Sequence, residues 1–162
     1  MNIFYLSTNA KSCASYHCDK HVVKMILETA QLLSTSHRIL DGDEGNEDLY
    51  KTTHKNHPSA LWVRESFDHY HWTFRLFKYL CEEYTKRYTK VHATARLLHL
   101  LAEAPVNIGV KGFTPPPQCM PDECKLDDTV NAYRNYYMLE KAYMAVWKYS
   151  PVPQWFSYTV ST

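Results

Sequence analysis

The stretch from residue 59 to residue 88 constrains the fold most, because apolar and aromatic residues recur along it at steps of three and four. This period matches the turn of an α-helix and predicts one long helix with a buried face. That face comprises Leu61, Trp62, Phe67, Tyr70, Phe74, Phe77 and Leu80 or Cys81. Pro58 suits the first position of such a helix, with Asn56 or His57 before it as the cap. We therefore expect a mainly α-helical chain.

A second helix is expected to begin at Ser12 and to continue to about Arg38. Residues 2–6, which precede it, form a short apolar run and are expected to be an extended arm. The apolar face of the helix is predicted to comprise Val22, Val23, Ile26, Leu27, Ala30 and Leu33. The chain should therefore start with an arm that leads into a long amphipathic helix.

Two further helices and two loops complete the predicted organisation. One helix is expected over about 90–103, ended by Pro105, and the last over about 128–149, with Asp127 or Asp128 as its cap. Residues 41–48 cluster Asp, Glu, Gly and Asn and predict an exposed acidic loop. Residues 105–126 are rich in proline and form a connection longer than usual, and such loops are often functional.

Length and composition narrow the class of protein. The chain has 162 residues and only 4 glycines, and it lacks the GxGxxG and GxxxxGK[ST] strings of nucleotide-binding folds. It has no apolar run long enough to span a membrane and no basic-then-apolar start typical of a signal peptide, so we expect a cytoplasmic protein with no membrane contact. Its 5 cysteines are expected to be free thiols. The predicted fold is a compact single-domain helical bundle over 1–162, with a short N-terminal arm and a long Pro-rich loop.

Basic residues are concentrated although the net charge is only +1. They gather in 51–57 and 86–96, where Tyr84 and Tyr88 lie among them. Basic and aromatic residues together can neutralise a phosphate backbone and stack on bases, and a helix N-terminus attracts phosphate. The same composition also describes a solvated helix end. The predicted nucleic-acid or phosphate ligands are Lys24, Lys55, Asn56, His57, Arg64, Arg87, Lys90 and His92.

A polar stripe follows one side of the predicted 12–38 helix. Its members, at steps of four and three, are His17, His21, Lys24, Glu28 and Gln31. An acid, a base and an amine in so short a stretch are suited to acid–base or nucleophilic chemistry. The alternative interpretation is a solvated helix face with an ordinary Lys24–Glu28 ion pair. The predicted catalytic residues are Asp19, Lys20 and His21 beside this stripe, and Glu123 in the Pro-rich loop.

Four strings resemble those of a widespread, largely uncharacterised phage-encoded family. They are DKHVVKM at 19–25, HKNHP at 54–58, RYTKVH at 87–92 and MPDE at 120–123. The overall layout is also similar to phage pyrimidine-dimer DNA glycosylases of the endonuclease V type. That resemblance implies a compact helical protein with an N-terminal arm and an aromatic, basic C-terminal segment that helps to hold bent DNA.

The same resemblance implies a site. The nucleophile of those glycosylases is the α-amine exposed after removal of Met1, which here corresponds to Asn2. The acid that works with the amine best matches Asp19, and its basic neighbours match Lys20 and Lys24. Lys20 is an alternative amine for Schiff-base formation.

Three functions follow from these patterns. The first is a phage DNA glycosylase/lyase, or related base-directed chemistry, that needs no metal and no cofactor. The second is a non-catalytic viral protein that sequesters a host signalling nucleotide, and the third is a metal-dependent hydrolase built on His17, His21, His57 and Asp122 or Glu123. The expected partner is DNA or a nucleotide, and the oligomeric state is left open. Convergence in one cleft of Asp19, Lys20, His21, His57 and Glu123 would favour catalysis or tight ligand capture.

Overall fold

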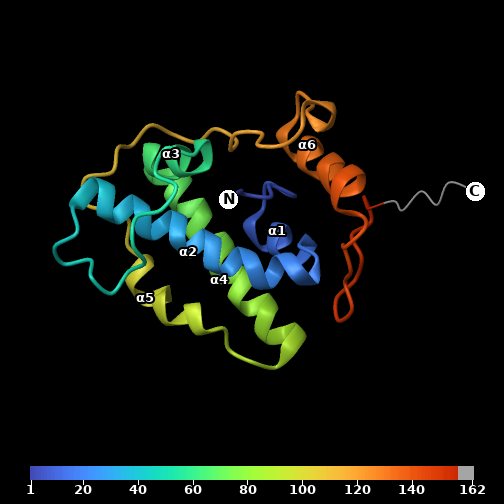
Figure 1. Ribbon diagram of the computed structural model, residues 1–162, viewed down its shortest axis with the longest axis horizontal. Helices are drawn as coiled ribbons and strands as arrows, with labels where there is room; N and C mark the ends of the chain where they lie inside the picture. The colour runs from blue at the N-terminus through green and yellow to red at the C-terminus, as the bar shows by residue number, and fades with distance from the viewer. Residues whose placement is uncertain (157–162) are drawn as a thin grey trace, which may run out of the picture.

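The structure is a computed structural model that describes residues 1–156, and within them it contains helices and no strand (Figure 1). The α-helices are α1 (Ala10–Tyr16), α2 (Asp19–Asp41), α3 (Pro58–Glu65), α4 (Phe67–Tyr88), α5 (Leu98–Leu101) and α6 (Thr129–Tyr136). Shorter turns are the 3-10 helices η1 (Ala93–Leu97) and η2 (Asp122–Cys124) and the π-helix η3 (Tyr137–Lys141). This architecture confirms the mainly α fold, with its N-terminal arm and its long Pro-rich loop.

The core lies where α2 crosses α4, with α1 and α3 packed against them (Figure 1). The arm enters this core, because Ile3, Phe4, Tyr5 and Leu6 are all buried. Figure 1 shows the N-terminus in the middle of the molecule, with α3 on one side and α6 on the other. The arm is therefore a structural element of the core rather than a loose end.

The buried face of α2 differs in part from the predicted one. Val22 and Ile26 are buried as expected, but Val23 and Leu27 are 40% and 39% exposed. The interior side of the helix instead includes Met25, together with His21 and Glu28 from the predicted polar stripe. Polar side chains are thus brought into the core next to the arm.

The predicted 59–88 helix is divided at Ser66, whose backbone is extended. The Ser66 hydroxyl donates to the carbonyl of Gly112 at 2.7 Å, and the Phe67 amide donates to the carbonyl of Gly109 at 2.8 Å. Residues of the Pro-rich loop therefore take hydrogen bonds at the point where the helix is interrupted. Figure 1 shows this loop running past α3 on its way to α6.

The other helix ends show which local predictions hold. His57 caps α3, with Pro58 in its first position, and Asp128 caps α6 by accepting from the Asn131 amide at 2.9 Å, all as predicted. The expected 90–103 helix is instead η1 followed by the single turn of α5, and the last helix ends in η3, so 142–149 is not helical.

The predicted 12–38 helix also has different ends. It starts earlier, at Ala10, because the Asn9 side chain caps it by accepting from the Ser12 amide at 2.9 Å. It is then divided at His17 and Cys18, where the backbone becomes extended before α2 begins.

A buried guanidinium explains that division. The Arg87 side chain, near the end of α4, is fully buried. Its Nε donates to Glu83 Oε1 at 3.0 Å and its Nη1 to Asp19 Oδ1 at 3.1 Å. Its remaining hydrogen bonds go to the carbonyls of His17, at 2.8 Å, and Ser15, at 2.9 Å. These carbonyls belong to the end of α1 and the break after it, so Arg87 stabilises the interruption.

The C-terminal segment is attached to the same network. The second carboxylate oxygen of Asp19 accepts from the Lys148 amide at 2.9 Å, and the Asp19 amide donates to the carbonyl of Val146 at 2.8 Å. One buried cation therefore links α1, α2, α4 and the segment that follows η3.

We predict that Arg87→Ala lowers the free energy of unfolding by about 3–5 kcal/mol, because it leaves the buried carboxylate of Glu83 and the half-buried carboxylate of Asp19 without their cation. Denaturant unfolding at neutral pH measures this loss. Lys86→Ala is the matched control, since Lys86 is the exposed neighbour on the same helix, and it should change stability by less than about 0.5 kcal/mol. Equal stability of the two variants would contradict the role given to Arg87.

Candidate functional site

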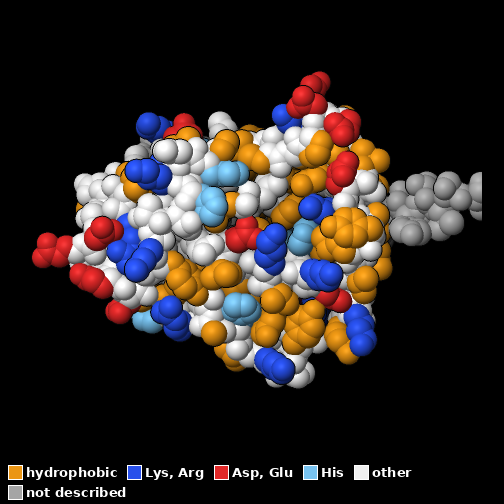
Figure 2. All heavy atoms as spheres, viewed as in Figure 1, with side chains coloured by type: hydrophobic (Ala, Val, Ile, Leu, Met, Phe, Trp, Pro, Cys, Tyr) orange, Lys and Arg blue, Asp and Glu red, His pale blue; other side chains and the backbone are white. Residues whose placement is uncertain are grey.

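A cavity of about 230 Å³ opens beside the first residues of the arm. Its wall includes Met1, Lys24, Glu28, His57, Tyr136 and Lys141. Figure 2 shows histidine, acidic and lysine side chains next to one another near the middle of the face where Figure 1 places the N-terminus. The cavity therefore joins the start of the chain, α2, the turn before α3, and the region of α6 and η3.

The α-amine of Met1 lies 3.5 Å from Oε1 of Glu28. The Glu28 side chain is only 12% exposed, and its Oε2 lies 3.7 Å from Nζ of Lys24, one helical turn earlier. This Oε2 atom is buried and has no hydrogen-bond partner among the described residues. Buried polar atoms are usually satisfied, so a carboxylate oxygen left free at a cavity is a candidate for contact with a substrate.

His57 contributes a largely neutral imidazole. Its Nδ1 accepts from the Ser59 amide at 3.1 Å, which fixes the ring at the start of α3. Burial lowers the pKa of His57, the positive charge of the α-amine lowers it further, and the Glu28 carboxylate acts in the opposite direction. The ring is therefore held at the cavity without adding a full positive charge at neutral pH.

Stacked rings form another part of the wall. The Tyr136 ring stacks on Phe4 with 5.9 Å between centroids, and Phe4 stacks on His21 at 4.3 Å. Nζ of Lys141 lies 5.1 Å from the centre of the Tyr136 ring. A planar base can stack on such a surface, and a phosphate can pair with the ammonium group beside it.

The four predicted catalytic residues do not meet at this cavity. Asp19 is paired with Arg87, and Lys20 is exposed on α2. His21 is buried behind Phe4, where its Nδ1 is hydrogen-bonded to the Tyr137 hydroxyl. Glu123 is exposed on η2. None of these four residues lines the cavity that includes Glu28, so the expected convergence is not found.

The predicted phosphate ligands are also divided. Lys24 and His57 line the cavity, whereas Lys55, Asn56 and Lys90 are exposed away from its wall, and Arg64 and His92 are half-buried. Arg87 needs a correction, because its side chain is fully buried and all three of its nitrogens already donate to protein oxygens. With no exposed surface, this side chain cannot reach a phosphate on the outside of the protein.

Three groups at the cavity were not predicted as functional from the sequence. Glu28 carried a usable clue, since it belongs to the polar stripe and is an acid in the middle of a long helix with an apolar face. The side chain of Lys141 carried none, because only the tertiary packing of η3 brings it to the cavity. The family resemblance implied an N-terminal α-amine but placed it on Asn2, whereas the structure places that of Met1 beside Glu28.

Two buried histidines lie behind the cavity. His17 is fully buried, its Nδ1 donates to the carbonyl of Cys13 at 2.7 Å, and desolvation lowers its pKa to about 4. Desolvation, with the charge of His17 as a smaller cause, lowers the pKa of His21 to about 3. Both rings are therefore neutral at pH 7, which makes His21 a packing and hydrogen-bonding residue there.

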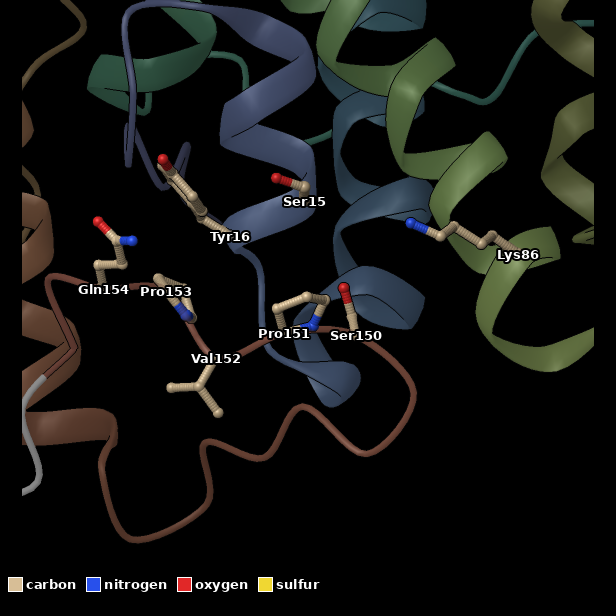
Figure 3. A pocket seen from close by; sticks show the side chains of 8 residues that line it. All are labelled: Ser15, Tyr16, Lys86, Ser150, Pro151, Val152, Pro153 and Gln154. Carbon is tan, nitrogen blue, oxygen red and sulfur yellow. The ribbon is translucent and has the colours of Figure 1, made fainter.

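A second cavity, of about 500 Å³, lies between α1, α4 and residues 150–154. Figure 3 shows Tyr16 and Pro153 on one side of it, Lys86 on the other, and Pro151 and Ser150 between them. Among residues 1–156, Lys86 is the one charged side chain in its wall. This cavity is larger, but it lacks the pairing of a carboxylate with an amine that the first one has.

The residues needed for the metal-hydrolase alternative do not gather. Within residues 1–156, no three His, Cys, Asp or Glu side chains come together in a way that could hold a metal ion. The same part of the chain has no helix long and apolar enough to cross a membrane.

A family model described as pyrimidine dimer DNA glycosylase matches residues 1–97. The matched region includes Met1, Lys24, Glu28 and His57, whereas Tyr136 and Lys141 follow it. No curated protein and no solved structure matches the chain.

We predict that stability falls as the pH is lowered from about 6.5 towards 4. The folded state keeps His17 and His21 neutral in this window, with pKa values of about 4 and about 3, whereas the unfolded chain takes up protons near pH 6.5. Each histidine therefore removes up to about 1.4 kcal/mol of unfolding free energy per pH unit.

Denaturant unfolding from pH 7.5 to 4 measures this slope. His21→Gln removes one titrating ring, so its profile should be flatter than that of the parent protein. An unchanged slope in this variant would show that His21 is not one of the groups responsible.

Proposed function

The chain belongs to the pyrimidine dimer DNA glycosylase family, and on this premise we propose that it excises pyrimidine dimers from DNA through its N-terminal α-amine, with Glu28 as the acid. The observation that carries the proposal is the position of the Met1 amine, 3.5 Å from a carboxylate whose other oxygen is buried without a hydrogen-bond partner. This arrangement pairs a nucleophile with a base in a largely buried position. The substrate partner is DNA.

The proposed reaction starts with transfer of a proton from the ammonium group to Glu28, which leaves a neutral amine. The amine nitrogen attacks C1′ of the damaged nucleotide, the C1′–N bond to the base breaks, and its electron pair leaves with the base, which takes up a proton. The Glu28 carboxylate stabilises the positive charge that develops on the sugar. The attacking nitrogen then loses its two protons while the C1′–O4′ bond breaks, and the ring oxygen takes the electron pair of that bond and one proton. The product is an imine between the protein and C1′ of the opened sugar, with a hydroxyl on C4′.

The imine accounts for a second, lyase step. It makes a proton on C2′ acidic, so a base can remove that proton while the C3′–O bond breaks and the phosphate leaves with the electron pair. Glu28 is the carboxylate placed to act as this base. One amine and one acid are therefore enough for both steps.

The rest of the cavity suits a nucleotide within DNA. Tyr136 and Phe4 offer a stacked aromatic surface, and Lys24 and Lys141 provide ammonium groups for the flanking phosphates. The proposal uses Glu28 in place of Asp19, because Asp19 is occupied by Arg87 and by the Lys148 amide. The carboxylate of Glu28 would repel a phosphate placed against it, which favours reaction at a sugar over capture of a free nucleotide.

We predict that borohydride traps a covalent adduct between the protein and duplex DNA that carries a single pyrimidine dimer or an abasic site. Borohydride reduces the imine to a stable amine, so peptide mapping of the adduct identifies the attacking group. The expected position is the N-terminal α-amine. Undamaged duplex and protein with an acetylated α-amine are the controls, and both should give no adduct.

An adduct mapped to Lys20 or Lys24 would replace the α-amine as nucleophile. The absence of any adduct or abasic product with all the damaged duplexes would contradict the proposed activity.

We predict that Glu28→Gln slows the single-turnover excision rate by at least about 100-fold, because the amide keeps the shape of the side chain but neither accepts the proton nor carries the charge. DNA affinity should stay equal or increase, since a negative charge is removed near the phosphates. The matched control is Glu82→Gln, an exposed carboxylate on α4. A Glu28→Gln protein that excises as fast as this control would show that Glu28 is not the acid.

A further inference from the structure

The side chain of Asn2 ties the start of the chain to its last third. Its Nδ2 donates to the carbonyl of Cys119 at 2.9 Å. Its Oδ1 accepts from the amide of Ile3 at 2.8 Å and from the hydroxyl of Tyr133 at 2.9 Å. The residue next to the α-amine is therefore held by groups of the arm, the Pro-rich loop and α6.

The Tyr133 hydroxyl is where these three elements meet. Tyr133 is fully buried. Its hydroxyl oxygen lies 2.6 Å from the carbonyl oxygen of Pro117 and 2.9 Å from Asn2 Oδ1, and these two acceptors share its proton. The oxygen also accepts from the Cys119 amide at 3.2 Å. Burial raises the pKa of Tyr133 far above its ordinary value, so the hydroxyl is a neutral donor at pH 7.

Further contacts fix the register of the arm. Nε of Arg134 donates to the carbonyl of Leu6 at 3.0 Å, and the thiol of Cys13 donates to the carbonyl of Phe4 at 3.1 Å. A shift of one residue in an extended chain is about 3.3 Å. That shift is as large as the 3.5 Å between the Met1 amine and Glu28, so the register decides whether the two groups meet.

We propose that Tyr133 is a positioning residue, which holds Asn2 and thereby keeps the α-amine against Glu28. The effect of this positioning on catalysis rests on the function proposed above. Pro117, Cys119 and Tyr133 all follow residue 97, where the family match ends. The amine and the acid thus belong to the matched region, whereas the residues that align them belong to the remainder of the chain.

The alignment can be measured without DNA. Limited acetylation with an activated ester, followed by peptide mass spectrometry, reports how freely the α-amine of Met1 reacts. Tyr133→Phe removes the hydroxyl that contacts Asn2, Pro117 and Cys119. The contact that holds the arm is the hydrogen bond to Asn2, worth about 1 kcal/mol, so labelling of Met1 should increase about fivefold. Lys24 lies in the same cavity and is exposed, so its labelling is the internal control and should not change. Tyr143→Phe, at an exposed tyrosine, is the matched control variant.

The second measurement is single-turnover excision of a pyrimidine dimer from duplex DNA. Tyr133→Phe should slow the chemical step about fivefold or more while the dissociation constant for DNA stays the same. If Tyr133→Phe fails to fold, Asn2→Leu removes the same link from the other side, keeps a second residue too large for removal of Met1, and should give the same rise in Met1 labelling. Circular dichroism confirms the fold of each variant.

The outcomes separate the two proposals. Labelling of Met1 that is unchanged in a folded Tyr133→Phe or Asn2→Leu variant overturns the positioning role, whatever the activity. Increased labelling supports that role even if the parent protein forms no adduct with any DNA, a result that would instead overturn the proposed function. A rise in Met1 and Lys24 labelling together would show general loosening and would overturn the specific role of Tyr133.

Discussion

The buried guanidinium of Arg87 is the contact on which the arrangement of the helices depends. A cation with no exposure is stable only when carboxylates and carbonyls surround it, and here two carboxylates and two carbonyls do so. Because the carbonyls come from Ser15 and His17, the first helix must end there and the chain must turn before α2 begins. Asp19, the first residue of α2, then pairs with the guanidinium and accepts from Lys148. The break between α1 and α2 and the docking of the C-terminal segment therefore have one electrostatic cause.

The break determines which side of α2 faces the arm. With α2 anchored at Asp19, the side that includes His21 and Glu28 is turned inwards, while Val23 and Leu27 remain partly exposed. The His21 ring stacks on Phe4, and the Glu28 carboxylate lies next to the α-amine of Met1. A carboxylate in this position is stabilised by two nearby cationic groups, the α-amine and Lys24, and it retains one oxygen without a hydrogen bond. The packing that places the Glu28 carboxylate in the interior therefore leaves one of its oxygens able to accept a further hydrogen bond.

The sequence predicted the features that depend on neighbouring residues. Apolar periodicity located the helical stretch at 59–88, and the caps at His57 and Asp128 follow from side chains next to the helix they begin. The break at Ser66 could not be predicted in this way, because its partners Gly109 and Gly112 lie more than forty residues away. The site follows the same division. Lys24 and His57 were predicted as phosphate ligands from local sequence patterns. The burial of Glu28 and the position of Lys141 at the cavity depend on long-range packing. Asp19 was chosen for its position beside the stripe, and the partner that occupies it, Arg87, is 68 residues further along the chain.

The link between Asn2 and Tyr133 also has a consequence for synthesis on the ribosome. Asn2 emerges from the exit tunnel long before its partner Tyr133, which follows 131 residues later. Until then, the arm lacks the hydroxyl of Tyr133 and the carbonyl of Cys119, and Leu6 lacks the guanidinium of Arg134. The first residues to be translated are therefore among the last to reach their final positions. A nascent chain that has completed α2 and α4 already contains the amine and the acid, but the hydrogen bonds that align them are complete only when α6 has been made.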